Sequence, residues 1–156
     1  PANFAFRPDG TLVLYDFGCV KRLEPAVVEA YLFTVRASLE ERYEDVEQGM
    51  IRLGARNLDG AHVPPNYYKV WRDIFSKPFQ GHSYDFGVAQ LQRDAIAPVV
   101  QSALAAKYMT SFQPPSELVF LDRVVVGHYG TLRRLGARAN FRPLLDPYLA
   151  RAATTA

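Results

Sequence analysis

The sequence predicts a mainly helical domain (mainly α, α+β) that opens on a single β-hairpin. The chain has 156 residues, 49% of them apolar, which is about one domain's length and enough for a core without disulfides. Two short β-prone runs flank a turn within residues 4–17, and from residue 25 onward apolar residues recur at helical spacing. No repeat or linker interrupts the pattern. We therefore expect one domain over 1–156, with a helical part at 24–151.

The hairpin is predicted from its turn. Pro8 fixes the φ angle of one turn residue, and Asp9-Gly10 tolerates left-handed backbone, so residues 4–6 should pair antiparallel with residues 11–15. An isolated hairpin is marginal in water, and this one must rest on the helices. The chain also begins without Met, and we expect it to be a fragment of a longer protein.

The helices are delimited by proline and glycine. Pro25, Pro65 and Pro115 each stand where a first helical residue belongs, Gly54 is available as a left-handed C-terminal cap, and Gly136 is expected to end the long helix before it. Pro98 must bend or break the fourth helix. The expected helices cover residues 25–39, 41–53, 65–76, 88–109, 115–135 and 143–151, and residues 79–86 are expected to form a loop.

Composition excludes several classes of protein. A formal net charge of +2 gives little support for nucleic-acid binding, and Cys19 is the single cysteine, so no disulfide framework exists. The longest apolar stretch, residues 118–126, contains Asp122 and Arg123 and is shorter than the roughly 20 residues of a spanning helix. We expect no transmembrane segment and no nucleic-acid partner.

The first Asp-Phe-Gly tripeptide suggests a metal site. Asp16-Phe17-Gly18 directly follows a β-run, and Asn3 lies 13 positions earlier, before the hairpin. In protein kinases, an Asp at a strand end and an Asn at the end of the catalytic loop hold the magnesium ions that bridge nucleotide phosphates. Mg²⁺ prefers such hard oxygen ligands. We therefore predict Asn3 and Asp16 as metal ligands.

The same tripeptide occurs again at residues 85–87, in a different context. No strand or hairpin is expected before it, and a helical pattern follows. The simplest interpretation of Asp85 is a helix N-cap rather than a metal ligand.

Residues 3–23, NFAFRPDGTLVLYDFGCVKRL, resemble the ABC1 family of atypical kinases, also called UbiB, AarF or ADCK proteins. Pro1-Ala2-Asn3 corresponds to the tail of that family's catalytic loop. The stretch from Pro114 to Gly136 also resembles a later helix of the family, whereas residues 40–110 are recognisable mainly as helical.

The resemblance implies that the chain is part of the large C-terminal lobe of a protein-kinase-like fold. Residues 1–23 would be the end of the catalytic loop, the hairpin and the metal-binding Asp-Phe-Gly. Asn3, Asp16, Phe17 and Gly18 would contact ATP or ADP with Mg²⁺. The chain itself would contribute no catalytic residue, because the catalytic Asp is expected upstream of Pro1, so whether it is an enzyme stays open.

The resemblance also implies a setting for the parent protein. Its partners would be the missing N-terminal lobe of the same protein and a membrane surface or prenyl-quinone lipids. The protein would be cytoplasmic or peripheral at the inner membrane. The implied role is in ubiquinone or related prenyl-quinone and isoprenoid lipid metabolism, with the isolated chain inactive. The alternative is a non-catalytic helical module that binds a protein or a lipid.

Several other residues have competing interpretations. Cys19 is expected to be a small buried thiol. His62, His82 and His128 share no zinc-ligand spacing, and His128 is expected in the core. Arg123, beside the apolar stripe of its helix, is expected to be buried and paired with a carboxylate or several backbone carbonyls, with a clamp to Glu24 or Glu29 as the favoured pairing. The alternative is a polar edge of the stripe.

Two clusters complete the set. The aromatic residues at positions 67, 68, 71 and 75 are expected to pack in the core rather than to face a lipid. The arginines at 133, 134, 138 and 142 either bind anionic lipid head groups or complement the C-terminus of a helix, and the sequence favours neither.

Overall fold

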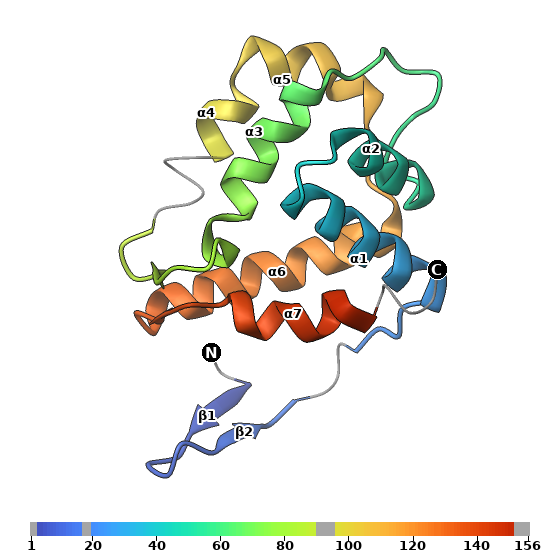
Figure 1. Ribbon diagram of the computed structural model, residues 1–156. Coiled ribbons are helices and arrows are strands. Elements are labelled where there is room, and N and C mark those ends of the chain that lie inside the picture. The colour runs from blue at the N-terminus through green and yellow to red at the C-terminus, as the bar shows by residue number, and fades with distance from the viewer. Residues whose placement is uncertain (1–2, 17–19, 90–95, 152–156) are drawn as a thin grey trace.

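The predicted hairpin is present at the start of the computed structural model, which describes residues 3–16, 20–89 and 96–151 (Figure 1). Strand β1 (Phe4–Phe6) pairs antiparallel with β2 (Leu12–Leu14). Phe4 lies opposite Leu14, and Phe6 lies opposite Leu12. Gly10, with a φ of 84°, occupies the left-handed position of the turn as predicted.

The rest of the described chain is mainly helical, as predicted. The helices are α1 (Pro25–Leu39), α2 (Tyr43–Arg52), α3 (Pro65–Phe75), α4 (Ala97–Val100), α5 (Ala103–Tyr108), α6 (Ser116–Arg134) and α7 (Arg142–Arg151). Short 3₁₀ turns follow α3 at Lys77–Phe79 and α5 at Met109–Ser111. The hairpin lies below the helices in Figure 1.

Three helices end in the same hydrogen-bonded cap. The left-handed residue after each helix is Gly54 for α2, Gly136 for α6 and Glu41 for α1. In α6, the Gly136 N–H donates to the Arg133 carbonyl and the next N–H reaches back to Leu132, both at 3.0 Å. These paired bonds are those of the Schellman motif, which satisfies the last carbonyls of a helix. Gly54 is the left-handed cap that was predicted, and Gly136 ends α6 as predicted, whereas the non-glycine cap at Glu41 was not foreseen.

Helices α1 and α2 pack closely because a glycine lies between them. Gly49 of α2 is buried against Thr34 of α1, and a Cβ atom on Gly49 would overlap the Thr34 side chain. The Thr34 hydroxyl donates to the Ala30 carbonyl at 2.7 Å, which holds that side chain in place. Gly49 therefore permits a helix contact that any larger residue would widen.

The core lies among α1, α2, α3 and α5. Its buried members are Ala37, Val46, Val63, Tyr67, Tyr68 and Tyr108, with Tyr43, Met50, Trp71, Leu104 and Phe112 packed around them. The aromatic rings contact one another directly, for example Tyr67 stacked on Phe112 with centroids 5.2 Å apart. Tyr67 and Tyr68 thus confirm the core interpretation of the aromatic cluster, while Phe75 at its end is 45% exposed.

The segment 79–109 differs from its prediction in two ways. Within the described part of residues 88–109, the helical pattern gives two short helices separated at Ser102, whose hydroxyl accepts from the Ala105 N–H. Pro98 is the second residue of α4, a position near a helix start where a proline is tolerated. In addition, residues Tyr84–Asp85 form a short strand, β3, that pairs antiparallel with β4 (Arg138–Ala139).

Helix α6 has the predicted length but not the predicted burial. None of its described side chains is fully buried, and its most covered residues are half-buried. His128, expected in the core, is exposed, and so is Val124. The apolar stripe of α6 therefore covers the helical body only partly.

Candidate functional site

The hairpin brings the two predicted metal ligands to neighbouring strand ends. The Tyr15 N–H donates to the Asn3 carbonyl at 2.8 Å, which extends the pairing of β1 and β2 by one step. Asp16 is the next residue after Tyr15, so Asn3 and Asp16 lie at the same open end of the hairpin. Both residues are exposed.

The donor chemistry of this pair fits Mg²⁺. A carboxylate and an amide supply hard oxygens, and Mg²⁺ usually takes only one or two carboxylates from protein, with phosphate oxygens and water completing its shell. Within the described residues, no group of three or more His, Cys, Asp or Glu side chains is arranged to hold a metal ion. Asn3 and Asp16 would therefore hold an ion only together with oxygen ligands from elsewhere.

The other two predicted contacts cannot be placed. Phe17 and Gly18 lie outside the described residues, and so does Cys19, for which a buried thiol was expected. Of the predicted site, the structure thus places Asn3 and Asp16 and leaves the remainder a prediction.

The second Asp-Phe-Gly tripeptide has a local structural role. Asp85 follows Tyr84 in β3, and its Oδ1 accepts the Gly87 N–H at 2.8 Å. The Val88 N–H donates to the same oxygen at 3.4 Å. The carboxylate therefore closes a turn of the backbone, as Asp side chains often do. Asp85 was expected to cap the start of a helix. Its carboxylate does accept backbone N–H groups, but those of a turn at residues 86–88.

Among the residues that the structure describes, Arg56 is a buried cation, and the sequence analysis did not identify it. Arg56 is 6% exposed, and its Nε donates to Glu47 Oε1 at 3.1 Å. The guanidinium also donates to the carbonyls of Ser111 at 3.1 Å and Ala61 at 2.7 Å, and to the Asn57 carbonyl. Its five donors are thus largely satisfied, which a buried guanidinium requires.

Backbone bonds reinforce this arrangement. Residues 55–57 pair with residues 111–113 through the Asn57 N–H to the Ser111 carbonyl and the Gln113 N–H to the Ala55 carbonyl, at 2.9 and 3.0 Å. Arg56 therefore connects α2, the loop that follows it and the segment before α6. Burial, together with the negative charge of Glu47, raises the pKa of the neighbouring Tyr68 to about 12.

Arg123 is not the buried clamp that was predicted. Its side chain is exposed on α6, and no acceptor is assigned to it in the described part of the chain. Leu121 and Val125 of the apolar stripe are half-buried, whereas Arg123 between them faces solvent. Arg123 is therefore a polar edge of the stripe and not a clamp.

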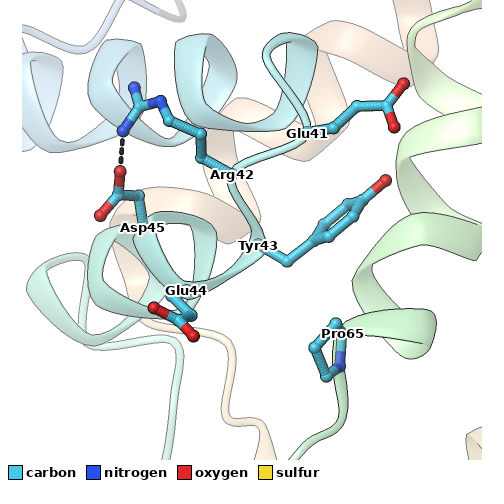
Figure 2. Close-up of a pocket in the computed structure, with 6 residues that line it drawn as sticks. All are labelled: Glu41, Arg42, Tyr43, Glu44, Asp45 and Pro65. Atoms are coloured by element: carbon cyan, nitrogen blue, oxygen red, sulfur yellow. Dashed lines mark ion pairs between the residues drawn. The ribbon is translucent and has the colours of Figure 1, made fainter.

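One cavity lies away from the hairpin, at the turn between α1 and α2. It has a volume of about 410 Å³, and Figure 2 shows the Tyr43 ring directed toward α3 while Arg42 turns away to pair with Asp45. Glu41 on the same turn pairs with Arg72 at 2.8 Å. Three of the four charged residues that line this cavity, Glu41, Arg42 and Asp45, are thus in ion pairs, and none of the predicted site residues lines it.

For the arginine cluster at the end of α6, both interpretations stay open: binding of anionic lipid head groups and complementing the C-terminus of a helix. Arg133 and Arg134 occupy the last turn of α6, where cations are favoured, and both are exposed. Arg142 pairs with Asp146 at 2.6 Å. Helix complementarity accounts for Arg133 and Arg134 without a ligand, but their exposure is equally suited to an anionic surface.

Comparison of the chain with protein-family models, with curated proteins and with solved structures found no match in any of the three. Among the described residues, no helix combines the length and the apolar character needed to cross a bilayer. The elements of the structure by themselves establish a mainly helical α+β domain with a short hairpin at its start.

Proposed function

We propose that the chain is part of the large lobe of an ABC1-type atypical kinase or ATPase, and that Asn3 and Asp16 help to hold Mg²⁺ with ATP or ADP. One observation carries the proposal: the bond from the Tyr15 N–H to the Asn3 carbonyl brings an Asn and an Asp of the kinase-like motif to one end of a hairpin. Carboxylate and amide oxygens match the ligand chemistry of Mg²⁺.

Each part of the hairpin has a task in this proposal. The turn at Asp9-Gly10 sets the register, and the register places Asn3 beside Tyr15 and therefore close to Asp16. When bound, the metal would neutralise and orient the nucleotide phosphates. Asn3 and Asp16 would contribute oxygens from opposite strands, so that an ion between them is positioned by the backbone pairing rather than by flexible loops.

The remaining machinery would come from other parts of the protein. In this proposal the catalytic Asp, the phosphate-contacting lysine and the nucleotide-covering loop belong to segments outside this chain, and residues 1–156 alone do not turn over ATP. The resemblance also extends the proposal to a role in prenyl-quinone or isoprenoid lipid metabolism at a membrane surface.

The test compares the two tripeptides in the intact protein. Asp16→Asn should abolish Mg²⁺-dependent nucleotide binding, measured by calorimetry with and without Mg²⁺, because it removes the carboxylate of the metal pair. Asp85→Asn is the matched control and should leave binding intact, since its carboxylate bonds only to a local turn. Loss of binding in the Asp85 variant with retention in the Asp16 variant would contradict the assignment.

A second candidate function is a non-catalytic interaction module, and α6 favours it. Val119 and Val126 are 44% and 66% exposed on that helix. Gly127 and Gly130 have no atom within 4 Å of a Cβ position, so packing within the described chain does not account for them. The upstream coding sequence discriminates between the two functions: an Asp in the loop that ends at Asn3 supports catalysis, and its replacement supports the module.

A further inference from the structure

A second cavity, of about 240 Å³, lies between the hairpin and the C-terminal end of α6. It is lined by Phe4 and Phe6 of β1 and by Thr131, Arg134 and Leu135 at the end of α6. This volume is below the roughly 300–1,000 Å³ of sites for drug-sized ligands. The space suits one aromatic ring or a short alkyl chain.

Three of the five residues that line the cavity, Phe4, Phe6 and Leu135, are apolar. The Phe4 and Phe6 rings meet edge to face with centroids 6.1 Å apart, and both project from the same face of β1. Their cross-strand partners Leu14 and Leu12 lie on that face too, and each is about half exposed. The apolar wall therefore continues from the cavity along the hairpin, where an apolar group would displace water favourably.

The single charge in the lining is the guanidinium of Arg134. This side chain is exposed, and no carboxylate is paired with it in the described part of the chain. The Thr131 hydroxyl already donates to the Gly127 carbonyl at 3.1 Å, so it retains only acceptor capacity toward a ligand. An anionic group in the cavity would therefore bind Arg134 and not Thr131.

The end of α6 does not oppose such an anion strongly. Helix C-termini carry partial negative charge on unpaired carbonyls. Here the Gly136 N–H and the following N–H satisfy the carbonyls of Arg133 and Leu132. The cationic side chains of Arg133 and Arg134 further offset the helix dipole.

We propose that this cavity binds a small amphipathic carboxylate, with its carboxylate on Arg134 and its apolar body along Phe4 and Phe6. The site is separate from the proposed metal pair, because neither Asn3 nor Asp16 lines it. It therefore stands or falls independently of the proposed kinase function.

The test uses octanoate as the probe and ¹⁵N-labelled residues 1–156, followed by two-dimensional amide NMR. Octanoate should cause saturable shifts of the amides of Phe4, Phe6 and residues 131–135. Octylammonium, which has the same chain and the opposite charge, should bind at least several-fold more weakly. Diffuse shifts that do not saturate, or equal binding of both probes, would overturn the proposal.

Two neighbouring arginines provide a matched pair of variants. Arg134→Gln should weaken octanoate binding several-fold, which is the range of an ion pair near solvent, and should leave the binding of octanol unchanged. Arg133→Gln makes the same change in charge at a residue outside the lining and should leave octanoate binding within twofold. If both variants weaken octanoate binding equally, the attraction between octanoate and the arginines is non-specific, and the proposed site is refuted. Leu135→Ser should weaken octanoate and octanol alike, and failure to do so would exclude the apolar wall.

Discussion

Replacing Arg56 with methionine should destabilise the domain by about 3–5 kcal/mol, which is the range for removing one partner of a buried ion pair. The structure supports the upper part of this range. The substitution leaves Glu47 unpaired with its side chain 21% exposed, and it removes the donors to the Ser111 and Ala61 carbonyls. Each lost hydrogen bond to a charged group contributes about 1.5–3 kcal/mol in isolation, and the losses are not additive.

The assay is urea unfolding followed by the fluorescence of Trp71, the single tryptophan, which packs against the core. For an m-value of about 2 kcal/mol/M, the midpoint should fall by roughly 2 M with little change in slope. Because the total stability of a domain is about 5–15 kcal/mol, the variant should remain folded or nearly so in water.

Arg123→Met is the control for this experiment. Arg123 is exposed on α6, so the same change of residue type should alter stability by no more than about 0.5 kcal/mol. A loss below about 1 kcal/mol for Arg56→Met, or an equal loss for both variants, would refute the role assigned to Arg56.

Three further predictions concern packing, backbone strain and pH. Gly49→Ala should destabilise the domain by about 1–3 kcal/mol, because its methyl group would overlap Thr34. Gly130→Ala, whose methyl group would lie in open space, should stabilise the domain by about 1 kcal/mol. Thermal unfolding of both variants separates the effect of packing from that of helix propensity. Glu41→Gly should raise the urea midpoint, since relief of a left-handed non-glycine residue at φ 59° gains about 1–2 kcal/mol, which exceeds the loss of the partly exposed ion pair with Arg72; a lower midpoint would contradict this. Unfolded tyrosine ionises near pH 10 and folded Tyr68 near 12, so stability should fall as pH rises from 10 to 12, and Tyr68→Phe should reduce that dependence in urea midpoints measured across the range.

Local patterns predicted the elements whose causes are local. The hairpin follows from its turn residues, and α1 and α6 begin near prolines and end near left-handed residues, all within a few positions in sequence. The strands β3 and β4 are two residues each and lie more than 50 positions apart, so no periodicity could predict their pairing.

The same distinction applies to charged residues. Arg56 lies in an irregular segment, and its burial depends on carbonyls as distant in sequence as Ser111. The proline and glycine signals around it gave no indication of this. The burial of Arg123 was predicted wrongly. An apolar stripe indicates which face of a helix is turned toward the core, but it does not indicate how much of that face the rest of the chain covers.

The candidate site was predicted to the extent that it depends on the hairpin. The register that joins Asn3 to Tyr15 follows from the turn, and it brings Asn3 and Asp16 to one end. The nucleotide contacts of Phe17 and Gly18 stay predictions, as does the kinase-like lobe itself, because both depend on parts that the local pattern does not determine.

The central claim is that Asn3 and Asp16 form one metal site, and paramagnetic Mn²⁺ in place of Mg²⁺ tests it most directly. Titrated together with ADP into the ¹⁵N-labelled intact protein, whose other segments and nucleotide supply the remaining oxygen ligands, Mn²⁺ should broaden the side-chain amide of Asn3 and the backbone amide of Tyr15 at concentrations that leave Gly87, beside Asp85, unaffected. Asp16→Asn should abolish the effect. Broadening that centres on Gly87, or that is unchanged in the Asp16 variant, would contradict the claim.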